Sequence, residues 1–468
     1  MSEEIHNLSI AQPDAGGNLL QKLGIALGAV GLLVLVIALS KLGLSGSVWL
    51  GVSLLCLLAA PIVFAMGNYR GKTAGIKNDG VWTSSLTAKG AIGWLVGIFL
   101  TGFYIVLYWF PAVLGAAPED GSNSGLIGFF DPLSLALNGR VASEWFVYGT
   151  LYTVAILGLG IKFIIKYRHN RYQLVRTISV MVSQLFLAYL IPEILTAMNQ
   201  DLPYFAKDVK NVWPLNYYFF DAWHLDAMRS SSLGMFYLVL GLLMFLIVTP
   251  VLTYYVGKRW YCSWVCGCGG LAETAGDPFR HLSSKKLSAW KVERWMIHAV
   301  MVFIFIMTTA TLYGYFTGAT SIFGLDIYST FRKPYGFLIG AAFSGVVGVG
   351  FYPILGSRVW CRFGCPMAGY MGIIQRFKSR FRITTNGGQC ISCGNCSTYC
   401  EQGIDVRWYA QRGQDVVRAS CVGCGICSAV CPRGVLNLEN GDTSKDRYDA
   451  SPITFGNQGV GLTEDLTD

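Results

Sequence analysis

Long apolar runs alternate with short polar connectors through the first three quarters of the chain. An apolar run of about 20 residues is long enough to cross a bilayer as a helix. Eight such runs predict eight spans, at residues 22–41, 47–67, 90–115, 145–166, 175–197, 233–256, 294–316 and 336–356. We therefore expect an all-α polytopic membrane protein, with a leader over residues 1–21 and a transmembrane domain over residues 22–357.

The composition and charge support this assignment and orient the chain. Of the 468 residues, 53% are hydrophobic and only 13% are charged, whereas a soluble domain carries about 25% charged residues. The net charge of +9 gathers in connectors that eight spans place on one side of the membrane, at residues 68–89, 162–176, 257–293 and 358–382. The positive-inside rule then predicts a bacterial inner-membrane protein with both termini and all clustered Cys residues in the cytoplasm. This distribution fits membrane loops, so we expect no nucleic-acid partner.

Two cysteine runs after the last span have the spacing C-x2-C-x2-C-x3-C, at residues 390–400 and 421–431. In bacterial ferredoxins, three thiolates of each run bind one [4Fe-4S] cluster and the fourth binds the other cluster. The predicted ligands are Cys390, Cys393, Cys396 and Cys431 for cluster one, and Cys421, Cys424, Cys427 and Cys400 for cluster two. Residues 385–440 are thus predicted to form a small α+β ferredoxin-like domain. Glu401 follows Cys400, and we expect its carboxylate to lower the reduction potential of cluster two.

A second cysteine set follows the sixth and eighth predicted spans as an internal repeat, G-x-R-x-[WY]-C-x3-C. Its thiols are Cys262 and Cys266 in the first copy, and Cys361 and Cys365 in the second. Residues i and i+4 share a helix face, so each pair can present two sulfurs together. Three interpretations are open: a shared redox metal or a further iron–sulfur centre, a redox-active dithiol or transient copper site, and inert thiols. Cys268 is an additional thiol that could replace one ligand.

With these motifs, residues 230–435 resemble the membrane-bound polyferredoxins, a family that includes the nitrate reductase subunit NapH, the nitrous oxide reductase partner NosR and the copper-reducing assembly protein CcoG. The resemblance implies electron transfer along or across the membrane, commonly from the quinol pool or a cytoplasmic donor to a periplasmic acceptor. The family motif usually continues with Pro. Pro366 fits that pattern in the second copy, whereas Gly267 and Cys268 follow the first.

Three further segments carry weaker signals. Apolar residues at helical spacing predict an interfacial connector helix at residues 366–384, resting on the inner leaflet. The polar tail over residues 441–468 lacks periodicity and is predicted to be disordered. Thr317-Gly318-Ala319-Thr320 resembles the short sequence at which flavin mononucleotide is attached in related redox proteins. A plain loop is the favoured interpretation, so flavin at Thr320 is the minor alternative.

Together these features predict an electron-transfer subunit of an oxidoreductase system. It would move electrons between cytoplasmic [4Fe-4S] clusters and either a membrane quinone or a periplasmic redox partner. The alternative function is a metallocentre assembly or copper-reducing factor for a respiratory oxidase or reductase, because soft thiolates suit Cu(I).

Overall fold

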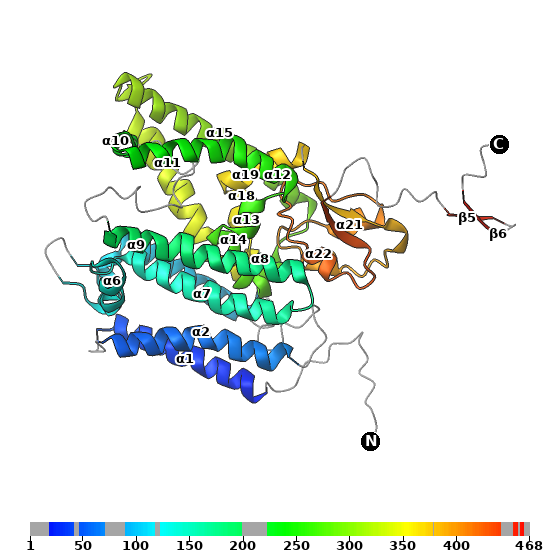
Figure 1. The fold of residues 1–468 in the computed structure, drawn as a ribbon, viewed down its shortest axis with the longest axis horizontal. Helices are drawn as coiled ribbons and strands as arrows, with labels where there is room; N and C mark the ends of the chain where they lie inside the picture. The colour runs from blue at the N-terminus through cyan, green and yellow to red at the C-terminus, as the bar shows by residue number, and fades with distance from the viewer. Residues whose placement is uncertain are drawn as a thin grey trace.

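The architecture is mostly helical (Figure 1). The computed structural model describes residues 18–41, 46–70, 89–117, 122–198, 222–377, 379–440, 453–456 and 459–462. The predicted leader is therefore outside the described residues except at its C-terminal end.

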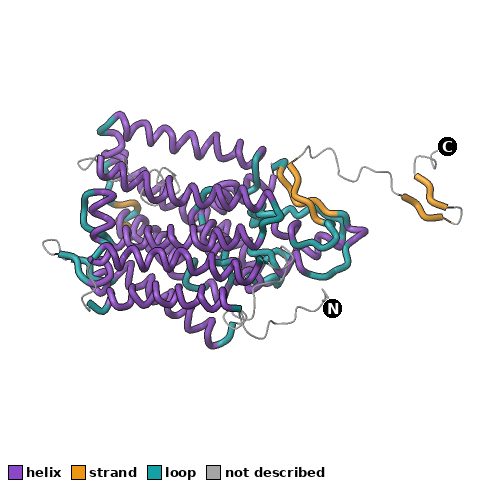
Figure 2. Tube along the Cα trace, turned by 60° about the horizontal axis from the view of Figure 1, so that its bottom comes forward, coloured by secondary structure: helices purple, strands orange, loops and turns teal. Residues whose placement is uncertain are grey.

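Seven described helical runs are long and apolar enough to cross a membrane, which confirms the predicted polytopic all-α fold. They are α1 (Leu19–Leu39), α2 (Ser47–Tyr69), α4 (Ala91–Trp109), α7 (Glu144–Lys166), the continuous run α8–η2–α9 (Arg171–Met198), the run α11–η5–α12 (Ser232–Tyr255) and α15 (Leu287–Thr317). Figure 2 shows these helices side by side in one bundle.

The eighth apolar run differs from the predicted span at 336–356, and it is not one of these seven. A helical segment begins earlier, with η7 (Tyr328–Arg332) and α16 (Lys333–Tyr335), and ends with η8 (Gly336–Val347). Most of it is π-helix, a form that is usually confined to single turns and often marks functional positions. A turn and the short α17 (Tyr352–Leu355) follow. The segment packs closely on α4, because a Cβ on Gly345 would lie 2.7 Å from the ring of Tyr108 and 3.0 Å from the ring of Tyr104.

Short elements connect the spans at either end of the bundle. On the side away from the cysteines lie η1 (Pro111–Leu114), α5 (Gly125–Phe129), α6 (Asp131–Asn138), α10 (Ala222–Arg229) and the hairpin β1 (Ser321–Ile322) with β2 (Leu325–Asp326). On the cysteine side lie α13 (Trp260–Trp264), α14 (Gly267–Thr274), η6 (Asp277–Leu282), α18 (Val359–Phe363) and α19 (Pro366–Phe377).

The C-terminal region is built on one antiparallel strand pair. Strand β3 (Phe381–Thr385) pairs with β4 (Leu436–Asn440), with Phe381 opposite Asn440. Between the strands lie η9 (Gly387–Gln389), α20 (Asn395–Thr398), α21 (Val406–Gln411) and α22 (Ile426–Ala429). This arrangement is the small α+β domain that the cysteine runs predict, and it begins a few residues before the expected boundary at 385.

The ferredoxin-like region is packed onto one end of the bundle (Figures 1 and 2). Ile426 and Val430, in and after α22, are fully buried in one apolar cluster with Phe163 and Tyr167 at the end of α7. Burial of such side chains stabilises the contact by about 25 cal/mol per Å² of apolar area removed from water. The ferredoxin-like region is therefore attached to the bundle by an apolar cluster to which both contribute side chains.

The connector between bundle and domain differs from the expected interfacial helix at 366–384. The helix α19 ends at Phe377, and β3 follows. Met367 and Met371 are buried in a cluster with Trp260 and Cys262. The first part of the apolar face of α19 therefore packs on the motif segments, whereas Phe377 at the end of the helix is 73% exposed.

The tail over residues 441–468 is described only as the hairpin of β5 (Ile453–Gly456) and β6 (Gly459–Leu462). The rest of the segment that was predicted to be disordered lies outside the described residues.

The close packing of α2 and α7 generates a stability prediction. A Cβ at Gly158 would lie 2.9 Å from Cγ of Pro61 and 3.0 Å from the carbonyl oxygen of Leu58. We expect Gly158→Ala to destabilise the protein by about 1–3 kcal/mol, the usual cost of overpacking. Thermal unfolding in detergent measures the effect. The matched control is Gly102→Ala, where no atom lies within 4 Å of the added Cβ; equal melting temperatures for the two variants would contradict the packing.

Candidate metal centres

The first candidate centre is a surface pocket in the ferredoxin-like region. Four thiols line this pocket, Cys390, Cys393 and Cys396 from the first run and Cys431 from the second. These are the four residues that the sequence assigns to cluster one, so the fold brings the interleaved set together. The donor set of four thiols from a tight loop and one distant residue fits a [4Fe-4S] cluster.

The second candidate centre lies beneath the first, toward the bundle. Cys427 has the thiols of Cys424, Cys421 and Cys400 as its main electrostatic neighbours, with Cys396 of the first centre as a weaker one. Cys427 and the first three are the predicted ligands of cluster two. Burial, reinforced by these thiols, raises the pKa of Cys427. A buried thiolate needs positive charge nearby, and the iron atoms of a bound cluster would supply it.

Glycines shape the loop that carries the second run. Gly423 and Gly425 have φ angles of +72° and +70°, which L side chains rarely adopt. A Cβ on Gly425 would also lie 3.0 Å from the side chain of Leu438. Only glycine therefore lets the chain turn here and present three cysteines to one side.

The transmembrane domain forms hydrogen bonds to the loop that carries the second cysteine run. Tyr172 Oη donates to the carbonyl of Gly423 at 2.8 Å, and Gln173 Nε2 donates to the carbonyl of Cys424 at 2.6 Å. Both donors lie in the first turn of α8. The second centre is thus fixed in place by a membrane-spanning helix.

The twin C-x3-C motifs form the third candidate site, with a geometry different from the expected single helix face. Cys262 lies in α13 and Cys361 in α18, and each of these helices is only five residues long. Cys266 is the N-cap of α14, and Cys365 immediately precedes α19. The helix ends between the two cysteines of each motif, so the pair spans a break between two short helices.

The two motifs nevertheless converge. Cys262 has Cys361, Cys365 and Cys266 as electrostatic neighbours, although these residues come from segments about 100 positions apart. Cys268 lies beside Cys266, and its thiol hydrogen-bonds to the Cys266 sulfur. This bond and the backbone N–H groups of Gly269 and Cys268 outweigh burial, and they lower the pKa of Cys266 to about 6. We call these five thiols the five-thiol site.

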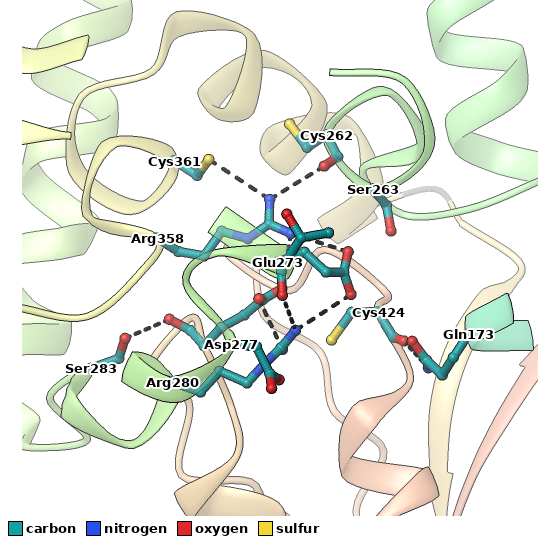
Figure 3. Close-up of polar contacts among 12 residues, drawn as sticks. Gln173, Cys262, Ser263, Glu273, Asp277, Arg280, Ser283, Arg358, Cys361 and Cys424 are labelled. Atoms are coloured by element: carbon teal, nitrogen blue, oxygen red, sulfur yellow. Dashed lines mark hydrogen bonds and ion pairs between the residues drawn. The ribbon is translucent and has the colours of Figure 1, made fainter. Parts of the chain in front are cut away.

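Two buried arginines join the motifs reciprocally. Arg259 Nη1 donates to the carbonyl of Cys361 at 3.1 Å, and Arg358 Nη1 donates to the carbonyl of Cys262 at 3.3 Å. The two arginines occupy the same position of the repeat, and each contacts the first cysteine of the other copy. Figure 3 shows the Arg358 guanidinium between the carbonyl of Cys262 and the sulfur of Cys361, which lies 3.9 Å away. The repeat therefore packs as a pseudo-symmetric pair around the thiols.

A layer of buried charges separates the five-thiol site from the second centre; we call it the ionic layer (Figure 3). Its members are almost fully buried and come from five different segments of the chain. The pairs are Arg358–Glu401 at 3.0 Å, Arg280–Glu401 at 2.9 Å, Arg280–Asp277 at 2.8 Å, Lys166–Asp277 at 2.7 Å, and Arg176 with Glu273.

The position of Glu401 changes the expectation drawn from the sequence. Burial alone would raise the pKa of this carboxyl, but Arg280 and Arg358 hold it below its usual value. Glu401 is therefore ionised, and its charge is neutralised by two guanidinium groups. Its influence on the second centre is smaller than that of the isolated carboxylate assumed from its place after Cys400.

The basic connectors predict solvated side chains for Arg176 and Arg280, and no sequence motif distinguishes Glu273 or Asp277. The available signal was a pair of carboxylates directly after the first cysteine motif, in an otherwise basic connector. Asp and Glu are almost never fully buried unless they are paired. Their burial here marks a structural junction that local spacing does not reveal.

Thr320, the minor candidate for flavin attachment, lies apart from all three centres. Its side chain is exposed, and its carbonyl accepts a hydrogen bond from the Ile327 amide at 3.0 Å. The helix α19, which directly follows Cys365, marks the level of the five-thiol site, and its Gly369 lies against Met301 of α15. Met301 is 16 residues before the end of α15 at Thr317, close to Thr320. At 1.5 Å per residue that is about 24 Å along the helix. The flavin assignment stays a prediction.

Comparison with known proteins supports the iron–sulfur interpretation of the twin motifs. A family model described as a 4Fe-4S binding domain matches residues 238–288 and 337–384, the segments that carry the two C-x3-C motifs. The chain is also 27% identical over 173 residues to YccM of Escherichia coli (strain K12), a protein whose name proposes a role in electron transport. The match covers 35% of this chain and 47% of YccM, so the chain spans about half the length of this relative. No solved structure matches. The narrower resemblance to NapH, NosR and CcoG stays a prediction.

The ionic layer generates a stability prediction. Glu401→Gln keeps the size of the side chain but removes a buried carboxylate with which both Arg280 and Arg358 pair. Arg280 then keeps Asp277, and both arginines keep only the longer contacts with Glu273. Breaking a buried pair in this way costs about 3–5 kcal/mol. We expect a markedly lower melting temperature, measured by circular dichroism on protein purified without oxygen.

The matched control for this variant is Asp415→Asn. Asp415 forms a partly exposed pair with Arg382 at 3.5 Å in the same region of the chain. Such pairs contribute about 0–1 kcal/mol. A similar, small effect in both variants would show that the ionic layer does not stabilise the junction.

Proposed function

We propose that this chain is a membrane iron–sulfur electron-transfer protein with two ferredoxin-type clusters and a third iron–sulfur centre at the five-thiol site. The observation that carries the proposal is the convergence of the two C-x3-C motifs beside the second ferredoxin-type centre. Iron–sulfur clusters, when bound, supply one-electron chemistry, and the protein sets their spacing, burial and potential.

The charge of Arg259 favours an anionic centre over a free dithiol. This guanidinium is fully buried, and it has no carboxylate within ion-pair distance among the residues that the structure describes. Its Nε and Nη2 groups lack hydrogen-bond partners there as well. A buried cation without a counter-charge is costly. A cluster held by four thiolates carries a net negative charge, which would balance the charge of Arg259. Four neutral thiols would not balance it, so the cluster is the better interpretation.

The spacing of the thiols favours a cluster over a single ion. Within the described residues, no three Cys, His, Asp or Glu side chains are grouped closely enough to hold one metal ion. A cubane holds each thiolate on a different iron, so its ligands are spread more widely than around a single ion. The match of both motif segments to a 4Fe-4S binding domain supports the same interpretation.

The proposed route runs inward from the ferredoxin-like region. Electrons entering at the first centre pass to the second, and the ionic layer adjoins both Cys424 of the second centre and Cys361 of the five-thiol site. From there they leave to a quinone in the membrane or to a periplasmic redox partner. The basic connectors support a cytoplasmic location of all three centres in a bacterial inner membrane.

Metal analysis of protein purified without oxygen tests this proposal. Three [4Fe-4S] clusters predict about twelve iron atoms and twelve acid-labile sulfides per chain. We expect Cys262→Ser with Cys361→Ser to reduce both values by about four, because the third centre loses two of its ligands.

Two single variants provide the controls. Cys56 lies in α2, away from the three centres, and Cys56→Ser should leave the iron content unchanged. Cys268 has no counterpart in the second repeat copy, where Met367 occupies the corresponding position, so Cys268→Ser should also retain the third cluster. Only about eight iron atoms in the unsubstituted protein would reject the third cluster. Copper in its place would favour the metallocentre assembly or copper-reducing function.

A further inference from the structure

The two ferredoxin-type centres have different surroundings. The second is enclosed by the transmembrane domain, whose Tyr172 and Gln173 hold its loop. The pocket of the first centre is lined only by residues of the ferredoxin-like region, and Cys393 is exposed. In Figure 1, α22 lies next to the end of α8, whereas α21 lies farther from the bundle. Among the described residues, the first centre therefore has the more accessible surroundings for a soluble partner.

Apolar and aromatic side chains are exposed at this pocket and on α21, which contributes Arg407 and Ala410 to its lining. Ile391, which lines the pocket, is 54% exposed, and Trp408 on α21 is 43% exposed. A hydrogen bond of 2.7 Å from Gln411 Nε2 to Ser392 Oγ fixes α21 to the loop of the first cysteine run. Exposed Trp and Arg side chains of this kind often dominate the energy of protein interfaces. We call this surface the distal face and define it by Ile391, Cys393, Arg407, Trp408, Arg412 and Arg433.

The distal face is positively charged. Arg407 and Arg433 line the same pocket as the four cysteines, and the described lining contains no carboxylate. Arg412 lies over the ring of Trp408, with its guanidinium carbon 4.0 Å from the ring centroid. All three arginines are exposed. A positive surface around a redox centre attracts a negatively charged partner and raises the rate of productive encounters.

Building on the proposed function, we propose that the distal face docks an acidic, soluble one-electron carrier, and that the first centre is the entry point for electrons. One electron leaves the reduced cofactor of the carrier and enters the oxidised cluster held by Cys390, Cys393, Cys396 and Cys431. The carrier departs oxidised by one electron. The face includes α21, which lies farther from the bundle than α22 (Figure 1), and this position leaves room for a carrier beside the membrane.

Stopped-flow reduction of the complete, cluster-loaded protein in detergent tests this proposal. The probe is an acidic flavodoxin in its fully reduced state, and the variant is Arg407→Glu with Arg433→Glu. We expect the second-order rate at low ionic strength to fall about tenfold or more, with a weaker dependence on salt, because steering by charge is lost. Reduction by photoreduced deazaflavin, a small mediator, should proceed at the same rate in both proteins and shows that the variant retains its clusters.

The matched control reverses two other exposed basic residues, Lys22 on α1 and Lys291 on α15. The control changes the net charge by the same amount, and its rate with flavodoxin should stay close to the original. Equal slowing of both double variants, or no slowing of the first, would overturn the assignment of the distal face. Reduction by deazaflavin but not by flavodoxin would overturn the acidic carrier and leave the proposed function standing. Failure of deazaflavin to reduce the loaded protein would instead reject the proposed function.

Discussion

The architecture of the redox region depends on the ionic layer between the bundle and the ferredoxin-like region. Glu401, which directly follows a predicted cluster ligand, is paired with Arg280 and Arg358 from the two motif-bearing connectors. Removing such charges from water is costly, and the cost is offset only when each charge keeps its partners. These partners belong to separate segments of the chain. All of the ion pairs can therefore form at once only when the spans, the motifs and the ferredoxin-like region are arranged as they are here. We infer that this requirement fixes the position of the second centre relative to the twin motifs.

The same layer links the electrostatics of the two inner centres. Arg358 contacts Glu401 beside the second centre and the sulfur of Cys361 at the five-thiol site. Hydrogen bonds and charges around the sulfurs are among the main determinants of cluster potential. A change at Arg358 therefore acts on both centres, and a change at Arg259 acts on the five-thiol site through the hydrogen bond of Arg259 to the carbonyl of Cys361.

The parts that the sequence predicts well are those governed by local spacing. The spans follow from apolar length, and the interleaved thiols of the first pocket follow from the spacing of the two runs. The meeting of Cys262 with Cys361 depends on tertiary packing, because about 100 residues separate them. The pairing of Glu273 with Arg176 does not follow from local spacing either, because charged residues in connectors are normally solvated. The irregular segment that ends at Val347 shows that hydropathy specifies apolar length but not helical winding.

The central claim is that the twin motifs hold a third iron–sulfur cluster next to the second ferredoxin-type centre. A cryo-EM map of the protein, purified and frozen without oxygen, tests this claim most directly. The account predicts three compact densities, one of them bonded to Cys262, Cys266, Cys361 and Cys365 and separated from the second by the ionic layer. Two densities only, with free thiols, a disulfide or a single ion at the twin motifs, would contradict it.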